Sequence, residues 1–390
     1  MTDLPAATPP TPADDPTGSP YGRHVGLRPA LDAAGTPATP TVTEYPVSFT
    51  GRADEYFRIW IVNVALTIVT LGVYLPWARV RTRQYFYGHV WVDGQNFEYR
   101  ANPVALLRGY VLVGTLFLGY TLSTQFQKYW IAVPLLLAYV LLYPWLVRQS
   151  LRFQAANTVH RGLRFRFSGT VKAAYVAYGA ANILASIGGI FALPWAWFMQ
   201  RRYQLDHVEY GTARGHFRGD VAPFYVIAVT AVGIGIGLAI AVALPVTAVL
   251  FGTSALDSGS LDDLKTTGLL AGIIAAYVAF ILLYTVLWQY VRAATMAYVL
   301  NHAELGGVVR TRATFRPWRL VWIGVTNALA TVVTLGLATP WAAIRRTKYV
   351  MEGVQVRAIA PLDDFAAGSA ERPSALGEAA TELLDIQVGF

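Results

Sequence analysis

One stretch of this sequence occurs three times, and its repetition constrains the fold more than any other feature. The copies are Asn63–Tyr85, Asn182–Tyr203 and Asn327–Tyr349. Each copy is an uncharged run that reaches a Pro-Trp-Ala triplet and a basic end, with a tyrosine nine residues after the proline. Glycine separates the two halves, and proline is tolerated in the first turn of a helix. Each copy therefore predicts a helix, a tight turn and a second helix.

The composition indicates that these copies lie in a membrane. Hydrophobic residues make up 55% of the 390 residues and charged residues only 14%, whereas soluble domains carry about 25% charged residues. Uncharged runs approach or exceed the roughly 20 residues that cross a bilayer as a helix, and tryptophan and tyrosine gather at their ends. The seven runs are Ile59–Ala78, Gly109–Gln127, Tyr129–Val147, Ala173–Gln200, Val221–Leu256, Thr266–Val291 and Leu320–Ile344.

The charges between the runs suggest how the chain is arranged across the membrane. Arginine and lysine in short loops favour the cytoplasmic side, and five of the connecting or flanking segments are rich in them. Only Ser123–Lys128 and the acidic connection around Asp262 differ. Seven simple crossings would leave some arginine-rich segments outside. We therefore expect the three repeated units to enter and leave on the cytoplasmic side as shallow, re-entrant hairpins, with seven or so simple spans as the alternative.

Short strand-like segments precede each return to the membrane. The pattern Phe-x-Gly recurs at Phe49, Phe167 and Phe217. Asp93-Gly94, flanked by alternating residues, is a strong signal for a β-hairpin, and looser versions follow at residues 157–167, 207–217 and 301–315. These pieces predict small cytoplasmic β-hairpins that could form a small sheet under the helices.

The predicted fold class is an all-α polytopic membrane protein with two transmembrane hairpins, three repeated helix-turn-helix units and small cytoplasmic β-hairpins. Residues 46–358 form the membrane domain, with repeat units over about 49–101, 167–220 and 312–358 and transmembrane hairpins over about 103–148 and 221–292. Residues 1–45 are rich in proline and threonine and predict a disordered tail. Residues 359–390 predict an acidic tail with a short amphipathic helix, either solvated or docked on the basic face.

The segment Phe49–Tyr87 resembles the YjgN family of bacterial inner-membrane proteins, whose function is unknown. The resemblance is carried by Glu-Tyr-Phe-x-Ile-Trp, Thr-Leu-Gly and Trp-Ala within this segment, and it extends to the end of the chain. The second copy of the repeat departs from the pattern, because Gly188-Gly189 and Phe191 replace Thr-Leu-Gly. The resemblance implies an inner-membrane location, and it implies no activity, ligand or site residue.

Each repeated unit carries a polar pair at membrane depth. An asparagine precedes a hydroxyl side chain by four residues, so both share one helix face. One interpretation is hydrogen bonding between helices, worth ~0.6 kcal/mol per contact in membranes. The other is a polar lining around a path for a ligand, as in transporters built from broken helices. The candidate lining residues are Asn63, Thr67, Asn182, Ser186, Asn327 and Thr331.

Basic residues at the ends of the repeated units form a second set of candidates. Arginines beside membrane helices attract anionic lipid headgroups by roughly 1 kcal/mol each, although they also serve simply to fix topology. The candidates are Arg79, Arg81, Arg83, Arg201, Arg202, Arg345, Arg346 and Lys348. Because the arginines follow membrane boundaries, nucleic acid is not an expected partner.

Catalytic signals are missing from the sequence. There is no cysteine, the six histidines are too scattered to bind metal by local spacing, and no nucleophile elbow, phosphate-binding glycine loop or HExxH occurs. Asp54 and Glu55 lie beside Arg52 and Arg58, where surface ion pairing explains them. We expect no enzyme activity, metal or cofactor. The predicted function is a membrane scaffold or lipid-interacting protein, and the alternative is a passive transporter or channel for a small solute.

Overall fold

Ten short β-strands close into one antiparallel barrel in the computed structural model, which describes residues 42–254, 262–359 and 362. The strands are β1 (Thr43–Phe49), β2 (Val90–Val92), β3 (Gln95–Tyr99), β4 (Thr158–His160), β5 (Leu163–Phe167), β6 (Val208–Tyr210), β7 (Ala213–Phe217), β8 (Ala303–Leu305), β9 (Val309–Ala313) and β10 (Val354–Ala358). Strands adjacent in the chain are adjacent in the barrel. The first half of β1 pairs with β10 and the second half with β2, which closes the ring.

Tight turns join the strands within each hairpin. Asp93 and Gly94 have φ angles of 48° and 72°, and Arg161 and Gly162 have 50° and 75°. Left-handed backbone at both central positions is the type I′ turn, whose twist suits a two-residue hairpin. The hairpin predicted at Asp93-Gly94 is confirmed, and the three looser sequences also form hairpins.

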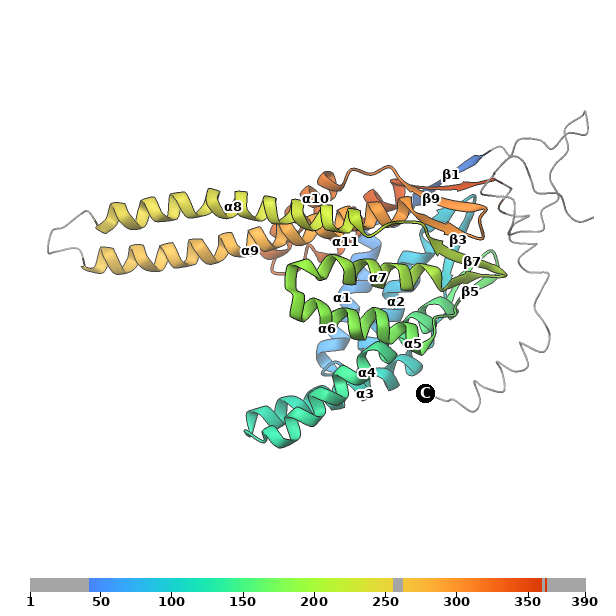
Figure 1. Cartoon of the computed structure of the whole chain (residues 1–390), viewed down its shortest axis with the longest axis horizontal. Coiled ribbons are helices and arrows are strands. Elements are labelled where there is room, and N and C mark those ends of the chain that lie inside the picture. The colour runs from blue at the N-terminus through green and yellow to red at the C-terminus, as the bar shows by residue number, and fades with distance from the viewer. Residues whose placement is uncertain (1–41, 255–261, 360–361, 363–390) are drawn as a thin grey trace, which may run out of the picture.

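Five helix pairs alternate with these strands along the chain. Four of the pairs are α1 (Ala53–Val69) with α2 (Leu75–Gly88), α3 (Pro103–Gln125) with α4 (Tyr129–Ala156), α8 (Ala222–Ser254) with α9 (Asp262–Asn301), and α10 (Pro317–Val333) with α11 (Thr339–Glu352). The remaining pair comprises α5 (Val171–Ala174), a π-helical segment η1 (Tyr175–Ala180), α6 (Ala181–Gly188) and η2 (Gly189–Phe191), followed by α7 (Leu193–Asp206). Figure 1 shows the strands gathered at one end of the molecule, with the helices extending from them.

The helix pairs form a ring above the barrel. Each pair follows one barrel strand and returns to the next, so both of its ends lie at the barrel. Neighbouring pairs contact one another through α2 and α3, α4 and η1, α7 and α8, α9 and α10, and α11 and α1. Both ends of each of the three repeated units therefore lie at the barrel; that this side is the cytoplasmic side of the membrane stays a prediction.

The predicted break within each repeated unit is present. Leu71 and Gly72 turn the chain with φ angles of 50° and 92°, and Leu335 and Gly336 repeat this turn with 51° and 95°. The proline of each Pro-Trp-Ala triplet lies in the first turn of the helix that follows. Proline there lacks only an N–H that has no partner within the helix.

The prediction of an all-α protein with small β-hairpins is wrong, because the hairpins combine into a closed barrel. A single two-stranded hairpin is marginally stable and exposes two unpaired edges. Closing four hairpins and the pair of β1 with β10 into one ring pairs every edge and encloses a core. That core contains Val47, Val92, Tyr210 and Val309, with Phe97 packed against it. The N-terminal strand also differs from the prediction, since β1 begins within the expected disordered tail.

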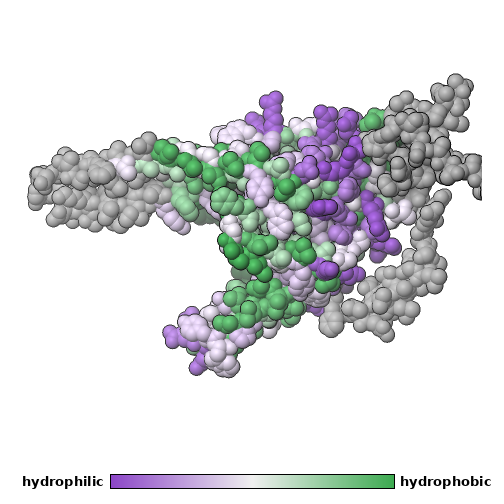
Figure 2. Space-filling view, in the orientation of Figure 1, coloured by the Kyte–Doolittle hydropathy of each residue, from purple (hydrophilic) through white to green (hydrophobic). Residues whose placement is uncertain are grey.

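The helix surfaces suit a lipid environment. Four helical segments are long and apolar enough to cross a membrane among the described residues: Pro103–Gln125, Tyr129–Ala156, Val171–Phe191 and Ala222–Ala241. Large apolar side chains on them, such as Phe117 and Leu141, are exposed. Figure 2 shows hydrophobic residues over the helices and hydrophilic residues over the barrel. Residues 1–41 and nearly all of the predicted acidic tail lie outside the described residues.

Candidate functional site

One backbone hydrogen bond joins the barrel to the end of every helix pair. It runs from the amide that follows β1, β3, β5, β7 or β9 to the carbonyl of the residue that directly follows α2, α4, α7, α9 or α11, over 2.8 to 3.0 Å. The carbonyl residues are His89, Asn157, His207, His302 and Gly353. Because the five bonds are equivalent, all five helix pairs join the barrel through the same kind of junction, including the two pairs outside the repeated sequence.

The Phe-x-Gly pattern is part of this junction. A Cβ atom on Gly51, Gly169 or Gly219 would lie 2.4 to 2.5 Å from the ring of the phenylalanine two residues earlier. Only glycine leaves room for the ring at these positions. At the fifth junction Phe315 stands in the glycine position, and a Cβ on Gly353 would lie 2.7 Å from Phe315. His89 and His207 follow the tyrosines of the first two repeated units by four residues, whereas the third unit has Gly353 at that position. Phe315 fills the space that a histidine side chain at position 353 would need.

The junction tyrosines and histidines bind the backbone. The Tyr85 hydroxyl accepts a hydrogen bond from the Arg52 amide at 2.8 Å and donates to the Arg52 carbonyl at 2.9 Å. Tyr298 makes the same two contacts with Asp220. His89 Nδ1 lies 2.6 Å from the Tyr85 carbonyl oxygen, and His207 and His302 repeat this contact. These side chains hold the ends of the helices in place.

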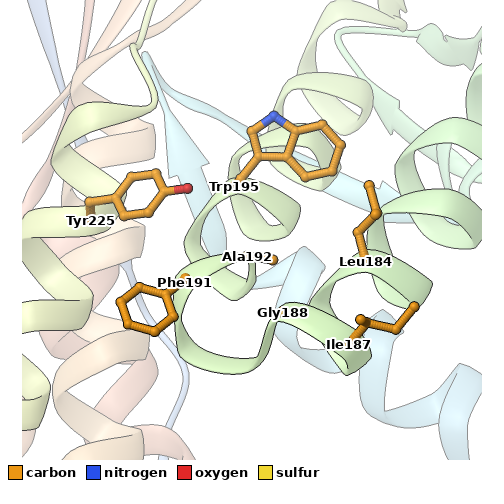
Figure 3. Close-up of a pocket in the computed structure, with 7 residues that line it drawn as sticks. All are labelled: Leu184, Ile187, Gly188, Phe191, Ala192, Trp195 and Tyr225. Atoms are coloured by element: carbon orange, nitrogen blue, oxygen red, sulfur yellow. The ribbon is translucent and has the colours of Figure 1, made fainter.

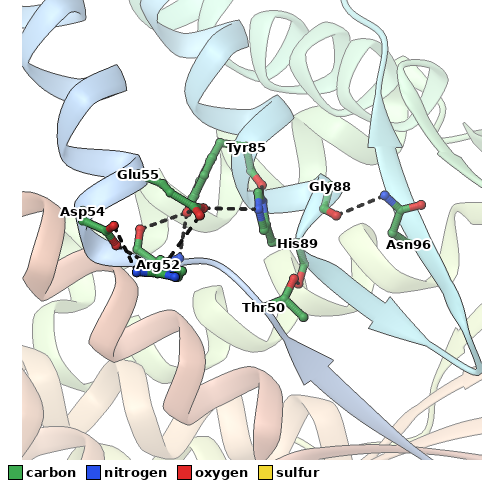
Figure 4. A network of polar contacts seen from close by, with 8 residues as sticks. All are labelled: Thr50, Arg52, Asp54, Glu55, Tyr85, Gly88, His89 and Asn96. Atoms are coloured by element: carbon green, nitrogen blue, oxygen red, sulfur yellow. Dashed lines mark hydrogen bonds and ion pairs between the residues drawn. The ribbon is translucent and has the colours of Figure 1, made fainter.

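The first junction adds charged groups (Figure 4). Arg52 binds Asp54 at 3.2 Å, and Glu55 Oε2 lies 3.2 Å from the Tyr85 hydroxyl, close enough to compete with the Arg52 carbonyl for its proton. The hydrogen bond from Arg52 holds the pKa of the Asp54 carboxyl below its usual value. Asp54 and Arg52 are both more than half exposed, so this is a surface ion pair of small energetic value. Glu55 also lies 3.9 Å from His89.

The predicted polar pairs bridge the two arms of their own units. Asn63 and Asn327 are buried, and each donates to the alanine carbonyl of Pro-Trp-Ala, at 3.5 Å to Ala78 and 2.9 Å to Ala342. Asn182 instead accepts from Gln200 at 2.8 Å. The hydroxyls of Thr67 and Ser186 donate to the carbonyl of the preceding asparagine, and the Thr331 carbonyl accepts from the Gly336 amide. A shared lining around a ligand path stays a prediction.

Basic residues form a belt around the molecule, on the second helix of every pair. They lie five to ten residues before the residue that directly follows the helix, which is about 7 to 15 Å along the helix axis. This basic belt comprises Arg79, Arg81, Arg83, Arg148, Arg152, Arg201, Arg202, Arg292, Arg345, Arg346 and Lys348. Among the described residues only Arg202 and Lys348 of the belt pair with a carboxylate.

Most other belt arginines bind neutral groups. Arg79 donates to the Tyr110 hydroxyl at 2.6 Å, Arg148 to the Gly169 carbonyl, and Arg345 to Thr326 and Asn327. The sequence-based candidates missed Arg148, Arg152 and Arg292 because α4 and α9 lie outside the repeated sequence. The spacing from Tyr298 to His302, which matches that from Tyr85 to His89, could have identified α9.

An apolar groove lies at the break of the third pair, against α8 (Figure 3). Its volume is about 400 Å³, and Leu184, Ile187, Phe191, Trp195 and Tyr225 are among the residues that line it. Gly188, one of the residues that replace Thr-Leu-Gly in the second copy of the repeat, also lines the groove. Its lining is apolar, and Leu184, Ile187 and Phe191 are at least half exposed.

Comparison with known proteins gives relatives in bacterial inner membranes. A protein named Inner membrane protein YjgN from Escherichia coli strain K12 is 34% identical over 154 residues, 38% of this chain and 37% of the relative. Its namesake from Salmonella typhimurium strain LT2 is 25% identical over 364 residues, 83% of this chain and 91% of the relative. The chain thus spans little more than a third of the E. coli relative that it matches. No solved structure matches the chain.

The family assignment rests on most of the described chain. The relatives are named inner membrane proteins, and four helices here are able to span a bilayer. The chain is therefore an inner-membrane protein. A model of the family described as "Bacterial protein of unknown function (DUF898)" matches residues 44–383, and the chain belongs to that family.

Proposed function

We propose that this protein is a non-enzymatic membrane scaffold that binds anionic lipid headgroups through its basic belt. The observation that carries the proposal is the charge of the belt, which carboxylates leave largely uncompensated among the described residues. The barrel differs, because Glu304 there binds both Arg218 and Arg310, and Glu209 binds Arg214. Charge at the belt therefore remains available to an external anion.

The position of the belt supports a lipid as that anion. Exposed apolar residues such as Leu71 and Leu335 lie at the turns on one side of the belt, and the barrel lies on the other. Basic groups at such a boundary gain roughly 1 kcal/mol each from an anionic membrane surface. In this proposal the barrel, whose surface is hydrophilic (Figure 2), projects from the membrane as a platform.

The test compares lipids of different charge. The protein is reconstituted in phosphatidylcholine alone or with phosphatidylglycerol, and its thermal unfolding is followed by circular dichroism. We expect phosphatidylglycerol to raise the melting temperature at low salt, and the gain to shrink at about 0.5 M salt because exposed charges are screened. Equal melting temperatures in both lipids would overturn the proposal.

A matched pair of variants locates the effect. In the belt variant, Arg79, Arg81 and Arg83 are replaced by glutamine. In the control, the exposed barrel residues Arg164, Arg166 and Arg312 are replaced in the same way, so the change in net charge is identical. The belt variant should lose part of the gain from phosphatidylglycerol, and the barrel variant should keep it.

A further inference from the structure

One arginine of the belt, Arg346, reaches a glutamine on another helix, near a second belt arginine, Arg292. Arg346 on α11 donates from Nη1 to Gln289 Oε1 on α9, at 3.2 Å. Arg292 lies on α9 about one helical turn after Gln289, and its guanidinium lies 6.0 Å from the centre of the Trp288 ring. The polar and aromatic partners of this arginine pair, Arg292 and Arg346, are thus neutral.

Gln289 is held in a defined place. Gly324 on α10 has no side chain, and a Cβ there would lie 2.5 to 2.9 Å from three atoms of the Gln289 side chain. The amide of Gln289 therefore packs against the bare backbone of α10 while its oxygen accepts from Arg346. Arg346 is consequently fixed in position by α9 and α10 before any ligand binds, which lowers the entropic cost of binding.

The electrostatics of the arginine pair are unfavourable without a counterion. Burial lowers the pKa of the Arg346 guanidinium, and the neighbouring Arg292 lowers it further. The acidic residue of α11, Glu352, binds Lys348 at 3.8 Å. No carboxylate of the described residues pairs with Arg292 or Arg346. Arg346 is partly buried, whereas Arg292 is exposed. A partly buried charge normally has a partner of opposite sign, so an unpaired Arg346 is costly.

We infer that Arg292 and Arg346 form a specific binding site for a phosphate group, either that of an anionic phospholipid headgroup or free phosphate. The inference rests on the proposed function, and it narrows a belt of weak contacts to one site. Arginine binds phosphate oxygens through paired N–H donors. Trp288, which is 47% exposed beside Arg292, suits the membrane interface where lipid phosphates lie.

The experiment uses full-length protein, stripped of lipid in a neutral detergent. It is titrated with short-chain phosphatidylglycerol, with the matching phosphatidylcholine, or with sodium phosphate, and the melting temperature and tryptophan fluorescence are recorded. We expect a saturable rise in melting temperature that largely survives high salt. Saturation by phosphatidylglycerol alone identifies a lipid headgroup, whereas an equal rise with sodium phosphate identifies free phosphate.

Variants distinguish this site from the rest of the belt. Arg292→Gln with Arg346→Gln should weaken the apparent affinity about tenfold or more, and Arg346→Lys should weaken it less, because lysine keeps the charge and loses the paired donors. The control, Arg201→Gln with Arg202→Gln, removes equal charge from exposed positions of α7. Without ligand, the Arg292/Arg346 variant should melt no lower than wild type, because it loses two like charges.

The outcomes separate the two proposals. If both double variants lose the same small part of the gain from phosphatidylglycerol, the arginine pair is no specific site, while the general role of the belt stands. If wild-type protein gains nothing from phosphatidylglycerol or phosphate over phosphatidylcholine, both proposals fail.

Discussion

At the scale of single residues, Gly169 of Phe-x-Gly must be glycine because an aromatic ring and a hydroxyl occupy the space that a side chain would need. A Cβ on Gly169 would lie 2.4 Å from the Phe167 ring and 2.5 Å from the Tyr203 hydroxyl. Gly169→Ala should therefore lower the stability by about 1 to 3 kcal/mol, as overpacking does. Gly88→Ala is the matched control, because nothing lies within 4 Å of its Cβ position. Thermal unfolding in detergent measures both; equal melting of the two variants would contradict the packing argument.

His160 makes the barrel sensitive to acid. Its side chain is buried and stacks on Phe97, with ring centroids 4.4 Å apart. Burial, and then the charge of Arg161, lowers the pKa of His160 from 6.5 to about 4. The folded state binds the His160 proton less readily than the unfolded state does. The stability that neutral His160 contributes is therefore fully present above about pH 6.5 and is lost as the pH falls toward 4. The loss between pH 7 and pH 5 amounts to about 2 kcal/mol at most.

His160→Gln tests this dependence. The variant should lose less stability than wild type when the pH falls from 7 to 5, as measured by the melting temperature. His216→Gln is the control at an exposed histidine that lies 3.4 Å from Asp206. Because the His216 side chain is 60% exposed, its replacement should not reduce the loss. A His160→Gln protein as acid-sensitive as wild type would refute the assignment.

At the scale of helix pairs, the asparagine that bridges the arms is more important than the hydroxyl beside it. Asn327 binds both the Ala342 carbonyl and Arg345, whereas the side chain of Thr331 makes no such bridge. Asn327→Ala should therefore lower the melting temperature, with a loss of about 1 kcal/mol for two membrane hydrogen bonds. Thr331→Ala should melt like wild type. A liposome flux assay on both variants tests the alternative, because a polar lining requires both residues.

The length of the helices explains how the short pairs sit in a bilayer. α1 has 17 residues and α2 has 14, so they reach about 25 and 21 Å. The hydrocarbon core is about 30 Å thick. We therefore expect such pairs to dip into the membrane and return, as the loop charges also predict. The sequence showed only three such units because α3, α4, α8 and α9 lack the Pro-Trp-Ala triplet. Their membership in the ring is visible in the junction bonds and in the contacts between neighbouring pairs.

At the scale of the whole molecule, the barrel could not be predicted because its pairings are not local. Each hairpin could be predicted from its turn residues, as at Asp93-Gly94. The contacts that close the ring join strands separated by whole helix pairs, such as β3 with β4. Closure further requires β1 to pair with β10, although the two strands lie at opposite ends of the domain's sequence. The belt was partly predicted from arginines at helix ends, but the pairing of Arg346 with Gln289 depends on contacts between separate helices.

The barrel places every β-hairpin on one side of the membrane, and this arrangement can be tested on intact cells. The chain has no cysteine, so single cysteines can replace the exposed residues Gln95 and Thr212 in the barrel and Lys128 between α3 and α4. We expect Gln95→Cys and Thr212→Cys to react with a membrane-impermeant maleimide only after the inner membrane is opened, because basic loops stay in the cytoplasm. Lys128→Cys should react from outside. Seven simple spans would instead put Gln95 and Thr212 on opposite sides, since three runs separate them, so labelling of only one of the two from outside would refute the closed barrel.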